Sequence, residues 1–254
     1  MSDLGLALRQ VRYTNKAFWR NPANAFFTFA FPLMFLVIFT AIFGNDTIPG
    51  TDFSTATYYV ATIGTFSIIT ATYTNLAINV SFSRDQGVLK RIRGSPIPGW
   101  VYLSGRISHA IVVSFILIAI VMAFGALFYD AEITTRTLPS FLLTVALGAA
   151  TFSGLGLALT AAIPNADASP AVVNASILPL LFISGVFIPL EDPTAWYVTL
   201  SKGFPVYHFA EAMKAAYFSP SGGGFEGGHL LVMAAWGVAG VILATLFFSW
   251  EPRR

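Results

Sequence analysis

The sequence contains no cysteine and few charged residues. Without cysteine the chain has no disulfide, no thiolate metal site and no cysteine nucleophile. Asp, Glu, Lys and Arg make up only 10% of the 254 residues, whereas about 25% is usual in a soluble domain, and hydrophobic residues make up 56%. The net charge is only +2, so nothing indicates a surface for nucleic acid. The composition therefore excludes an ordinary soluble enzyme.

The common motifs of nucleotide and metal chemistry are also missing. No lysine follows a glycine, so the G-K-[ST] end of a phosphate-binding P-loop is absent. His109, His208 and His229 are scattered along the chain, and no H-E-x-x-H motif occurs. We therefore expect no catalytic residue, no metal site and no cofactor site in this chain.

Long apolar segments are the main feature that is present. A helix rises 1.5 Å per residue, so about 20 mainly apolar residues cross the hydrocarbon layer of a bilayer. The segments that meet this criterion, none of which contains Asp, Glu, Lys or Arg, are 26–43, 55–80, 107–129, 140–163, 169–188 and 230–250. The first lacks a small-residue cleavage site followed by soluble sequence, so we interpret it as a retained span. The predicted fold is an all-α integral membrane protein with six transmembrane helices, in one domain over residues 1–254.

The basic residues are concentrated in a few connecting segments. Eleven of the 14 Lys and Arg lie in the N-terminal arm, between Arg84 and Arg106, or at the C-terminus, whereas Arg136, Lys202 and Lys214 lie in the other connections. Lys and Arg are in excess on the cytoplasmic side of membrane proteins. This bias predicts that both termini and the loop after the second segment are cytoplasmic. The only histidine in the apolar segments is His109, near a membrane boundary, and Asp, Glu, Lys and Arg are absent from them, so uphill transport would take its energy from a partner.

The N-terminal arm predicts a basic amphipathic helix at the membrane interface, over residues 3–21. Its apolar residues fall on one side, and Arg9, Arg12 and Lys16 fall mostly on the other. Trp19 is typical of an interfacial anchor, and Asn21-Pro22 ends the helix before the first span.

The loop after the second segment, FSRDQGVLKRIRGSPIP at 82–98, is a charged island. Residues 84–93 contain four basic residues against one acid, Asp85. Val88, Leu89 and Ile92 have the spacing of one helix edge, which predicts a short helix. Pro96 and Pro98 would end it. Such a helix can lie on anionic headgroups or dock into a partner's groove. The positive charge could equally serve only to orient the protein, and composition leaves both interpretations open.

The second segment is rich in hydroxyl and amide side chains. Those that fall near one helical stripe are Tyr58, Thr62, Thr65, Thr72, Asn75 and Asn79. Such groups avoid lipid, and they either bond to neighbouring helices or line a wet path. Both interpretations remain open. In the fourth segment, Ala150, Gly154 and Ala158 recur every four residues, which favours close helix packing.

The connection between the fifth and sixth segments, 189–229, is long and too apolar for a disordered loop. Segments 193–202 and 205–218 can each form a helix, and neither is long enough to span. We therefore expect a re-entrant or interfacial helical hairpin on the outer face.

The charged loop at 82–98 resembles the loop after the second span in ABC-2 type exporter permeases. The sequence of that loop in the family is approximately F-E-R-E-x-G-T-L-K-R-L-x-x-T-P-L. The identical positions after the first arginine are Gly87, Leu89, Lys90, Arg91 and Pro96, and Ile92 and Ser95 are conservative replacements. The two glutamates of the pattern are Ser83 and Asp85 here.

Other segments carry the same resemblance in the same order. Residues 183–189, ISGVFIP, are similar to the L-S-G-x-F-x-P that ends the fifth span in that family, and Trp196 follows. The turn 165–167 and the segment 204–207 also match. With six predicted spans and the amphipathic arm, the resemblance covers essentially the whole chain.

The resemblance implies a permease that dimerises, as a homodimer or with a closely related chain, and that receives two copies of an ATP-binding-cassette ATPase subunit. The ATPase would hold Mg-ATP, and the loop helix would sit in its groove with the arm bracing the contact. The implied contact residues are Arg9, Arg12, Arg84, Asp85, Gln86, Gly87, Val88, Leu89, Arg91 and Ile92. The implied candidates for the translocation path, under an outer lid formed by the hairpin, are Tyr58, Thr62, Thr65, Thr72, Asn75, Asn79, Asn174, Phe182 and Phe187.

The leading hypothesis is therefore the membrane subunit of an ATP-driven exporter in a bacterial cytoplasmic membrane. Its substrate would be hydrophobic or amphipathic: a drug, a lipid or a lipid-linked glycan. The alternative is a channel-like or structural membrane protein that is not coupled to ATP hydrolysis. The presence of a P-loop ATPase subunit as a partner would distinguish the two.

Overall fold

The computed structural model describes residues 3–47, 54–95, 97–131, 136–190, 192, 194–218 and 223–251. Throughout these ranges the regular structure is helical, apart from one isolated bridge between Thr47 and Ser54. In chain order the helices are α1 (Asp3–Trp19), α2 (Pro22–Phe43), α3 (Thr55–Ile69), the π-helical turn η1 (Thr70–Thr74), α4 (Asn75–Asp85), α5 (Val88–Arg93), α6 (Gly99–Tyr129), α7 (Leu138–Leu159), α8 (Ser169–Ile183), α9 (Trp196–Ser201), α10 (Pro205–Phe218) and α11 (Gly227–Phe247). Pro96 and Pro193 lie outside the described residues.

Four of these helices, α2, α6, α7 and α11, are long and apolar enough to cross a membrane. α8 is also apolar but has only 15 residues. It ends at Ile183 rather than at the predicted Ile188, because Gly185 takes a left-handed conformation with φ of 71°. α3, η1 and α4 follow one another directly from Thr55 to Asp85, so the polar second segment forms a long helix with a π turn in it.

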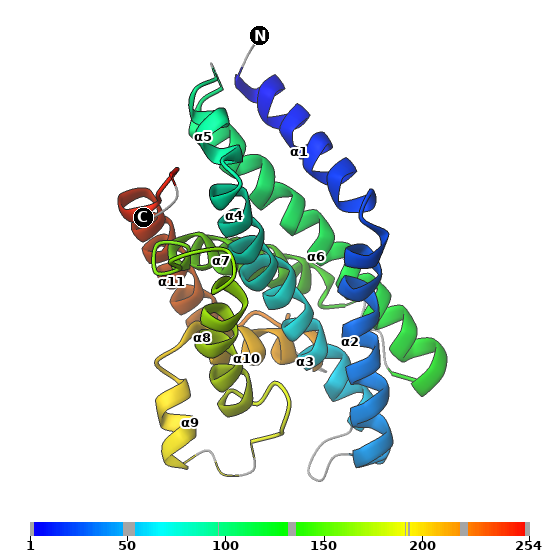
Figure 1. The fold of residues 1–254 in the computed structure, drawn as a ribbon. Helices are drawn as coiled ribbons and strands as arrows, with labels where there is room; N and C mark the ends of the chain where they lie inside the picture. The colour runs from blue at the N-terminus through cyan, green and yellow to red at the C-terminus, as the bar shows by residue number, and fades with distance from the viewer. Residues whose placement is uncertain are drawn as a thin grey trace.

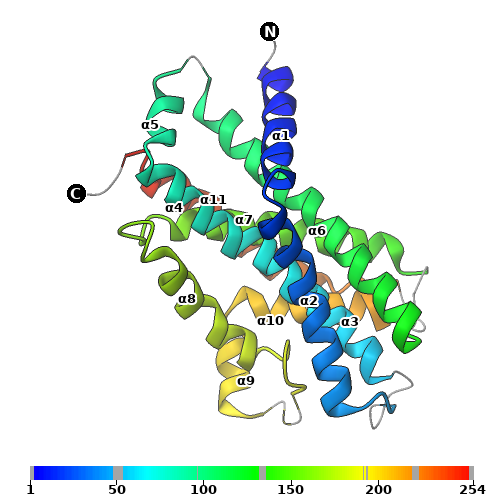
Figure 2. The same ribbon diagram turned by 45° about the vertical axis from the view of Figure 1, so that its right-hand side comes forward.

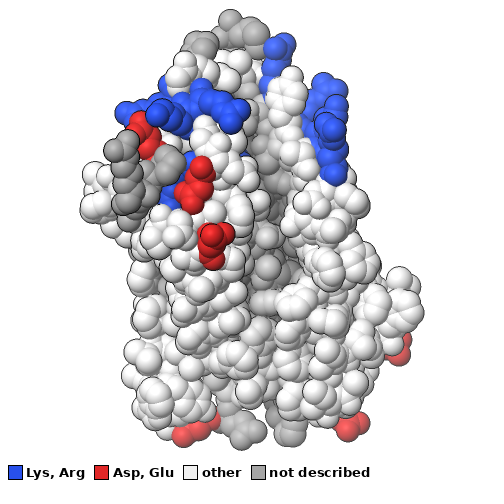
Figure 3. Space-filling model, in the orientation of Figure 1, with Lys and Arg blue, Asp and Glu red and all other residues white. Residues whose placement is uncertain are grey.

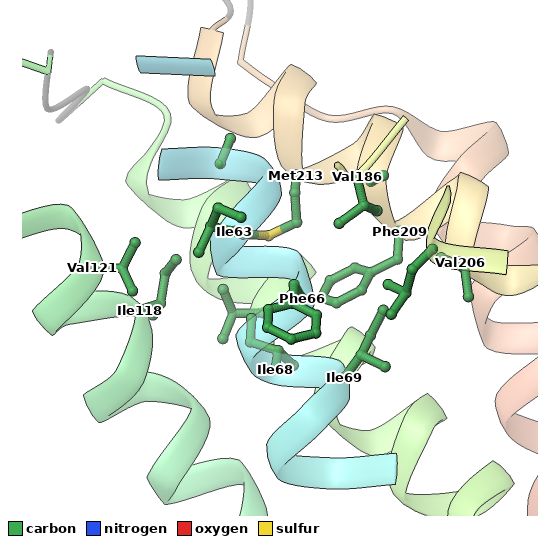
Figure 4. Close-up of a cluster of buried hydrophobic side chains, with 14 of the residues drawn as sticks. Ile63, Phe66, Ile68, Ile69, Ile118, Val121, Val186, Val206, Phe209 and Met213 are labelled. Carbon is green, nitrogen blue, oxygen red and sulfur yellow. The ribbon is translucent and has the colours of Figure 1, made fainter. Parts of the chain in front are cut away.

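The helices pack side by side around α3 (Figures 1 and 2). α1 lies along α6, α11 lies along α7, and α3 is in contact with α2, α6 and α10. At the centre, Ile63, Phe66 and Ile69 of α3 meet side chains of α6 and α10, as Figure 4 shows. Because α3 is covered on several sides, nearly all of its residues are buried, polar ones included.

Glycines set the closest helix contacts. A Cβ on Gly240 of α11 would lie 2.8 Å from the backbone nitrogen of Leu155 in α7, and a Cβ on Gly156 would lie 2.8 Å from the carbonyl oxygen of Tyr73 in η1. The predicted row of small residues is correct at Gly154, which faces Gly237 and Val241. It is wrong at Ala150, which is exposed, because the neighbouring Thr151 rather than Ala150 meets Gly237 of α11.

The connection between α8 and α11 contains two helices, as its sequence suggests, and α10 is the buried one. Val206, Phe209, Met213 and Tyr217 of α10 are each at most 2% exposed. The ring of Phe209 occupies the space that Gly148 of α7 leaves, since a Cβ there would lie 2.3 Å from the ring. α10 is therefore part of the helical core rather than a helix on its surface.

Candidate functional site

The charged loop begins where α4 ends. Gly87 has φ of 70° and separates α4 from α5, and no atom lies within 4 Å of a Cβ built on it. The left-handed backbone therefore explains the glycine, because a side chain would be strained there whatever the space. The predicted loop helix at 84–93 is corrected in this respect: Arg84 and Asp85 belong to α4, and the separate helix runs from Val88 to Arg93.

Arg84 is buried inside the chain, with 1% of its surface exposed. Its Nη1 donates to the carbonyl oxygen of Thr160 at 2.9 Å, and its Nη2 donates to that of Ile163 at 2.7 Å. These carbonyls follow the C-terminus of α7, where a cation is favoured by the helix dipole and satisfies groups that the helix leaves unpaired. Arg84 thus fastens the end of α4 to the end of α7.

Asp85 makes a second link from the same end of α4. One of its carboxylate oxygens, Oδ2, accepts a hydrogen bond from the backbone N–H of Ala166, in the turn before α8. The other oxygen lies 3.7 Å from Nε of Arg84. The end of α4, where the charged loop begins, is therefore bonded to the turn between α7 and α8.

The opposite end of α8 is also tied to the polar helix. Tyr58 of α3 donates from its hydroxyl to the carbonyl oxygen of Gly185 at 2.7 Å, just after α8. In the middle, the hydroxyls of Tyr73 and Ser176 lie 2.8 Å apart. The helix from Thr55 to Asp85 thus contacts α8 or its flanking turns near both ends and at its centre.

α5 presents its apolar edge to its own chain. Leu89 is fully buried in a cluster with Leu76, Val80 and Tyr102. Val88 and Ile92 are partly buried, whereas Gln86, Lys90, Arg91 and Arg93 are exposed. Of the residues predicted to contact an ATPase, Arg84 and Leu89 therefore face inward, because the short helix needs its apolar edge to attach to the bundle. The exposed members are the ones available to a partner.

The predicted contact residues of the arm, Arg9 and Arg12, are exposed on α1. Figure 3 shows Lys and Arg gathered at the end of the molecule that carries α1 and α5, in two groups over these helices. The structure thus brings the arm and the loop to one end of the helical bundle, although more than 60 residues separate them in sequence.

The predicted polar stripe divides into two parts. Tyr58, Thr62, Thr65 and Thr72 are buried within the chain, and the hydroxyls of Thr65 and Thr72 donate to carbonyls one turn earlier in their own helix. For these four residues, packing within this chain is observed.

The other two stripe residues lie elsewhere. Asn75 is partly buried and Asn79 is exposed, and both line a hollow beside α1 and α6. The backbone N–H of Asn75 donates to the carbonyl of Thr70, the i to i+5 bond of a π turn. Because a π turn inserts one extra residue, it rotates all later side chains relative to a regular helix. A constant period of 3.6 residues therefore could not place both halves of the stripe correctly.

The remaining path candidates are on and after α8. Asn174 is exposed, and Phe182 is 52% exposed with its ring 5.1 Å from that of Phe187. Phe187 itself is buried, and it stacks on Phe35 of α2. Phe187 therefore belongs to the same buried cluster as Tyr58, whereas Asn174 and Phe182 are exposed outside it.

One polar contact of this site was not predicted from the sequence. Arg106 of α6 donates from Nη2 to the hydroxyl of Ser83 at 3.0 Å. Ser83 occupies the position of a glutamate in the loop pattern that this chain resembles. That difference was the only sign in the sequence that the position is unusual, and it did not indicate that Arg106 is the contacting cation.

Several long apolar helices in one bundle, with the basic residues and a short loop helix at one end, define the class as a multi-pass membrane protein. A sequence model of the ABC-2 type transporter family matches residues 9–218. The chain therefore belongs to the ABC-2 type transporter family and is a permease, the membrane subunit of an ABC transporter without a nucleotide-binding domain. Membership implies an ATPase subunit as partner.

Two relatives show how far the similarity extends. The chain is 24% identical over 190 residues to the Bacillus subtilis (strain 168) protein named transport permease YvfS, covering 75% of this chain and 76% of the relative. It is 25% identical over 158 residues to the Escherichia coli (strain K12) protein named multidrug ABC transporter permease YbhR, covering 62% of this chain and 42% of the relative. The chain thus spans less than half the length of the second relative.

Proposed function

We propose that this permease exports a hydrophobic or amphipathic compound across a bacterial membrane, driven by ATP hydrolysis on a partner subunit. The proposal includes six spans, with α3, η1 and α4 together as the second and α8 as the fifth. It also includes two permease copies, two ATPase subunits and cytoplasmic termini. The name of the relative YbhR, a multidrug ABC transporter permease, favours a drug-like substrate.

The observation that carries the proposal is the attachment of α5 to a helix that is linked to α8 along its length. Arg84 and Asp85 hold the end of this helix next to α5, and Tyr58 holds the opposite end through Gly185. A movement of α5 imposed by an ATPase would therefore move α8 together with α3, as a rigid unit. Rigid-body movement of packed helices is a common way to convert a local contact into a change of access.

The proposed ATPase contact consists of the exposed groups at the basic end of the bundle. In the loop these are Gln86, just after α4, and Arg91 of α5, with Val88 and Ile92 partly accessible. On α1 they are Arg9 and Arg12. In this proposal Arg84 and Leu89 position the loop through their buried contacts within the permease and do not touch the ATPase.

Co-expression with a cassette ATPase encoded beside this chain tests the function. We expect a stable complex with magnesium-dependent ATPase activity in lipid, and Arg91→Glu should lower the amount of ATPase that co-purifies. Lys202→Glu, the same charge change at an exposed residue next to α9, is the matched control and should leave the complex unchanged. If no cassette subunit forms a complex with the wild-type chain, the protein functions without ATP coupling and the proposal fails.

A further inference from the structure

A hollow of about 430 Å³ lies between α1, the link to α2, α4, α5 and α6. Figures 1 and 2 show α1 and α5 on either side of the first turns of α6. The polar part of its lining includes Tyr13, Asn21, Asn24, Asn79, Arg106 and His109, and its apolar part includes Phe18, Val88 and Ile92. This volume is within the usual range for small-molecule sites, and the mixed lining suits a ligand with one polar and one apolar end.

Arg106 gives the hollow a positive charge. The guanidinium bonds to the hydroxyl of Ser83 and lies 5.1 Å from the centre of the Tyr102 ring, and both groups are neutral. No Asp or Glu is among the described residues that line the hollow. A partly buried cation is costly unless an opposite charge compensates it, so the hollow favours an anion.

Two nitrogens at the wall lack a hydrogen-bond partner among the described residues. They are Nε of Arg106 and Nδ1 of His109, and both are buried. A second, smaller hollow of about 60 Å³ is lined by the same two residues together with Asn24 and Asn79. Buried polar nitrogens normally have hydrogen-bond partners. Because both side chains line the hollow, a ligand group that accepts hydrogen bonds there would supply those partners once the side chains turn toward it.

We propose that this hollow binds the phosphate of an amphiphile, with Arg106 as the charged donor and Asn24, Asn79 and His109 as neutral donors. Arginine suits phosphate because its planar fork offers parallel N–H groups. The apolar wall of Phe18, Val88 and Ile92 would contact the part of the ligand next to the phosphate. The site goes beyond the proposed export function and does not depend on an ATPase.

The position of the hollow along the helical bundle favours a lipid as the source of the phosphate. It lies at the basic end of the bundle, beside the junction of α1 and α2 where Trp19 is exposed. Aromatic and basic residues mark the level of the headgroups in membrane proteins. A ligand here would contact α1 and α5 at once, because Thr14 and Val88 both line the hollow.

Native mass spectrometry of the full chain in detergent tests the site with phosphatidylglycerol and with diacylglycerol of the same acyl chains. We expect phosphatidylglycerol to bind at least about tenfold more tightly, which corresponds to about 1.4 kcal/mol. Arg106→Gln should remove that preference. Ser83→Glu should also remove it, because the hydroxyl of Ser83 already lies 3.0 Å from the guanidinium and a carboxylate there would supply the missing charge.

Ser83→Gln is the matched control, similar in size but neutral, and it should keep the preference. Equal binding of the two lipids to the wild-type chain would overturn the site, and so would an unchanged preference in folded Ser83→Glu. If Arg106→Gln does not fold, Ser83→Glu decides the question. Glycerol phosphate distinguishes the sources: tight binding on its own would identify a soluble phosphate ester, and failure to bind would identify the lipid.

Discussion

Arg84 and Asp85 are neighbours in the sequence, yet they hold two different parts of the chain. The arginine bonds to carbonyls at the end of α7, and the aspartate accepts from the N–H of Ala166 before α8. A basic residue in a charged loop is normally interpreted as exposed. Here the buried carbonyls at a helix end provide the better environment, because they need donors that water cannot supply.

Removal of the Arg84 guanidinium should destabilise the fold. We expect Arg84→Met to lower the free energy of unfolding by about 2–4 kcal/mol, because two charge-assisted hydrogen bonds are lost and buried carbonyls remain. Arg93→Met is the control, since Arg93 is 63% exposed and its contact with Glu251 at 3.8 Å should contribute at most about 1 kcal/mol. Unfolding in detergent measures both. A stable Arg84→Met protein that no longer binds its ATPase would instead place Arg84 at the partner.

At the scale of elements, α7 and α11 approach so closely that only glycine fits at some positions. Gly240→Ala should cost about 1–3 kcal/mol, because the new methyl would lie 2.8 Å from the backbone of Leu155 and neither helix can yield without losing contacts. Gly227→Ala is the control, as no atom lies within 4 Å of its Cβ position. Melting temperatures in detergent should separate the two. A stable Gly240→Ala protein would mean that the helices pack less closely than described.

The polar side chains of the second span either pack against neighbouring helices or line a transport path, and cysteine substitution can distinguish the two. The chain has no cysteine of its own, so each introduced cysteine is the only thiol. We expect Thr62→Cys and Thr65→Cys to be protected from aqueous thiol reagents, because both positions are fully buried. Asn79→Cys should react, because Asn79 is exposed beside the hollow. Labelling of Thr62→Cys that increases with Mg-ATP and the ATPase would show that this stretch opens to water during transport.

At the scale of the whole molecule, the charge distribution predicts the orientation. Lys90 of α5 and Thr194 of the connection before α9 are both exposed. In intact cells, a membrane-impermeant reagent should label Thr194→Cys, whereas Lys90→Cys should react only after permeabilisation, because the excess of Lys and Arg predicts that the basic end is cytoplasmic. The opposite labelling pattern would invert the topology and would place α5 beyond the reach of a cytoplasmic ATPase.

The sequence analysis identified the family and the helical membrane class correctly, because both depend on features that the chain carries locally. Apolar length, the position of Lys and Arg, and the loop motif need no tertiary contact to be recognised. It was less accurate for individual site residues. Leu89 was predicted to contact a partner, but a helix of six residues is held by what it buries. Arg84 was predicted to do the same, but it belongs to α4 and bonds to the carbonyls of Thr160 and Ile163.

By itself the sequence determined an all-helical permease with a basic end and a short helix in its charged loop, because composition and motif act within single segments. Only the tertiary structure decided that Arg84 and Asp85 anchor this loop to the α7–α8 turn, and that Arg106 meets Ser83 beside an uncompensated hollow. It also decided how the π turn divides the polar stripe. These outcomes depend on which helices become neighbours, and that follows from the packing of the whole bundle rather than from any one segment.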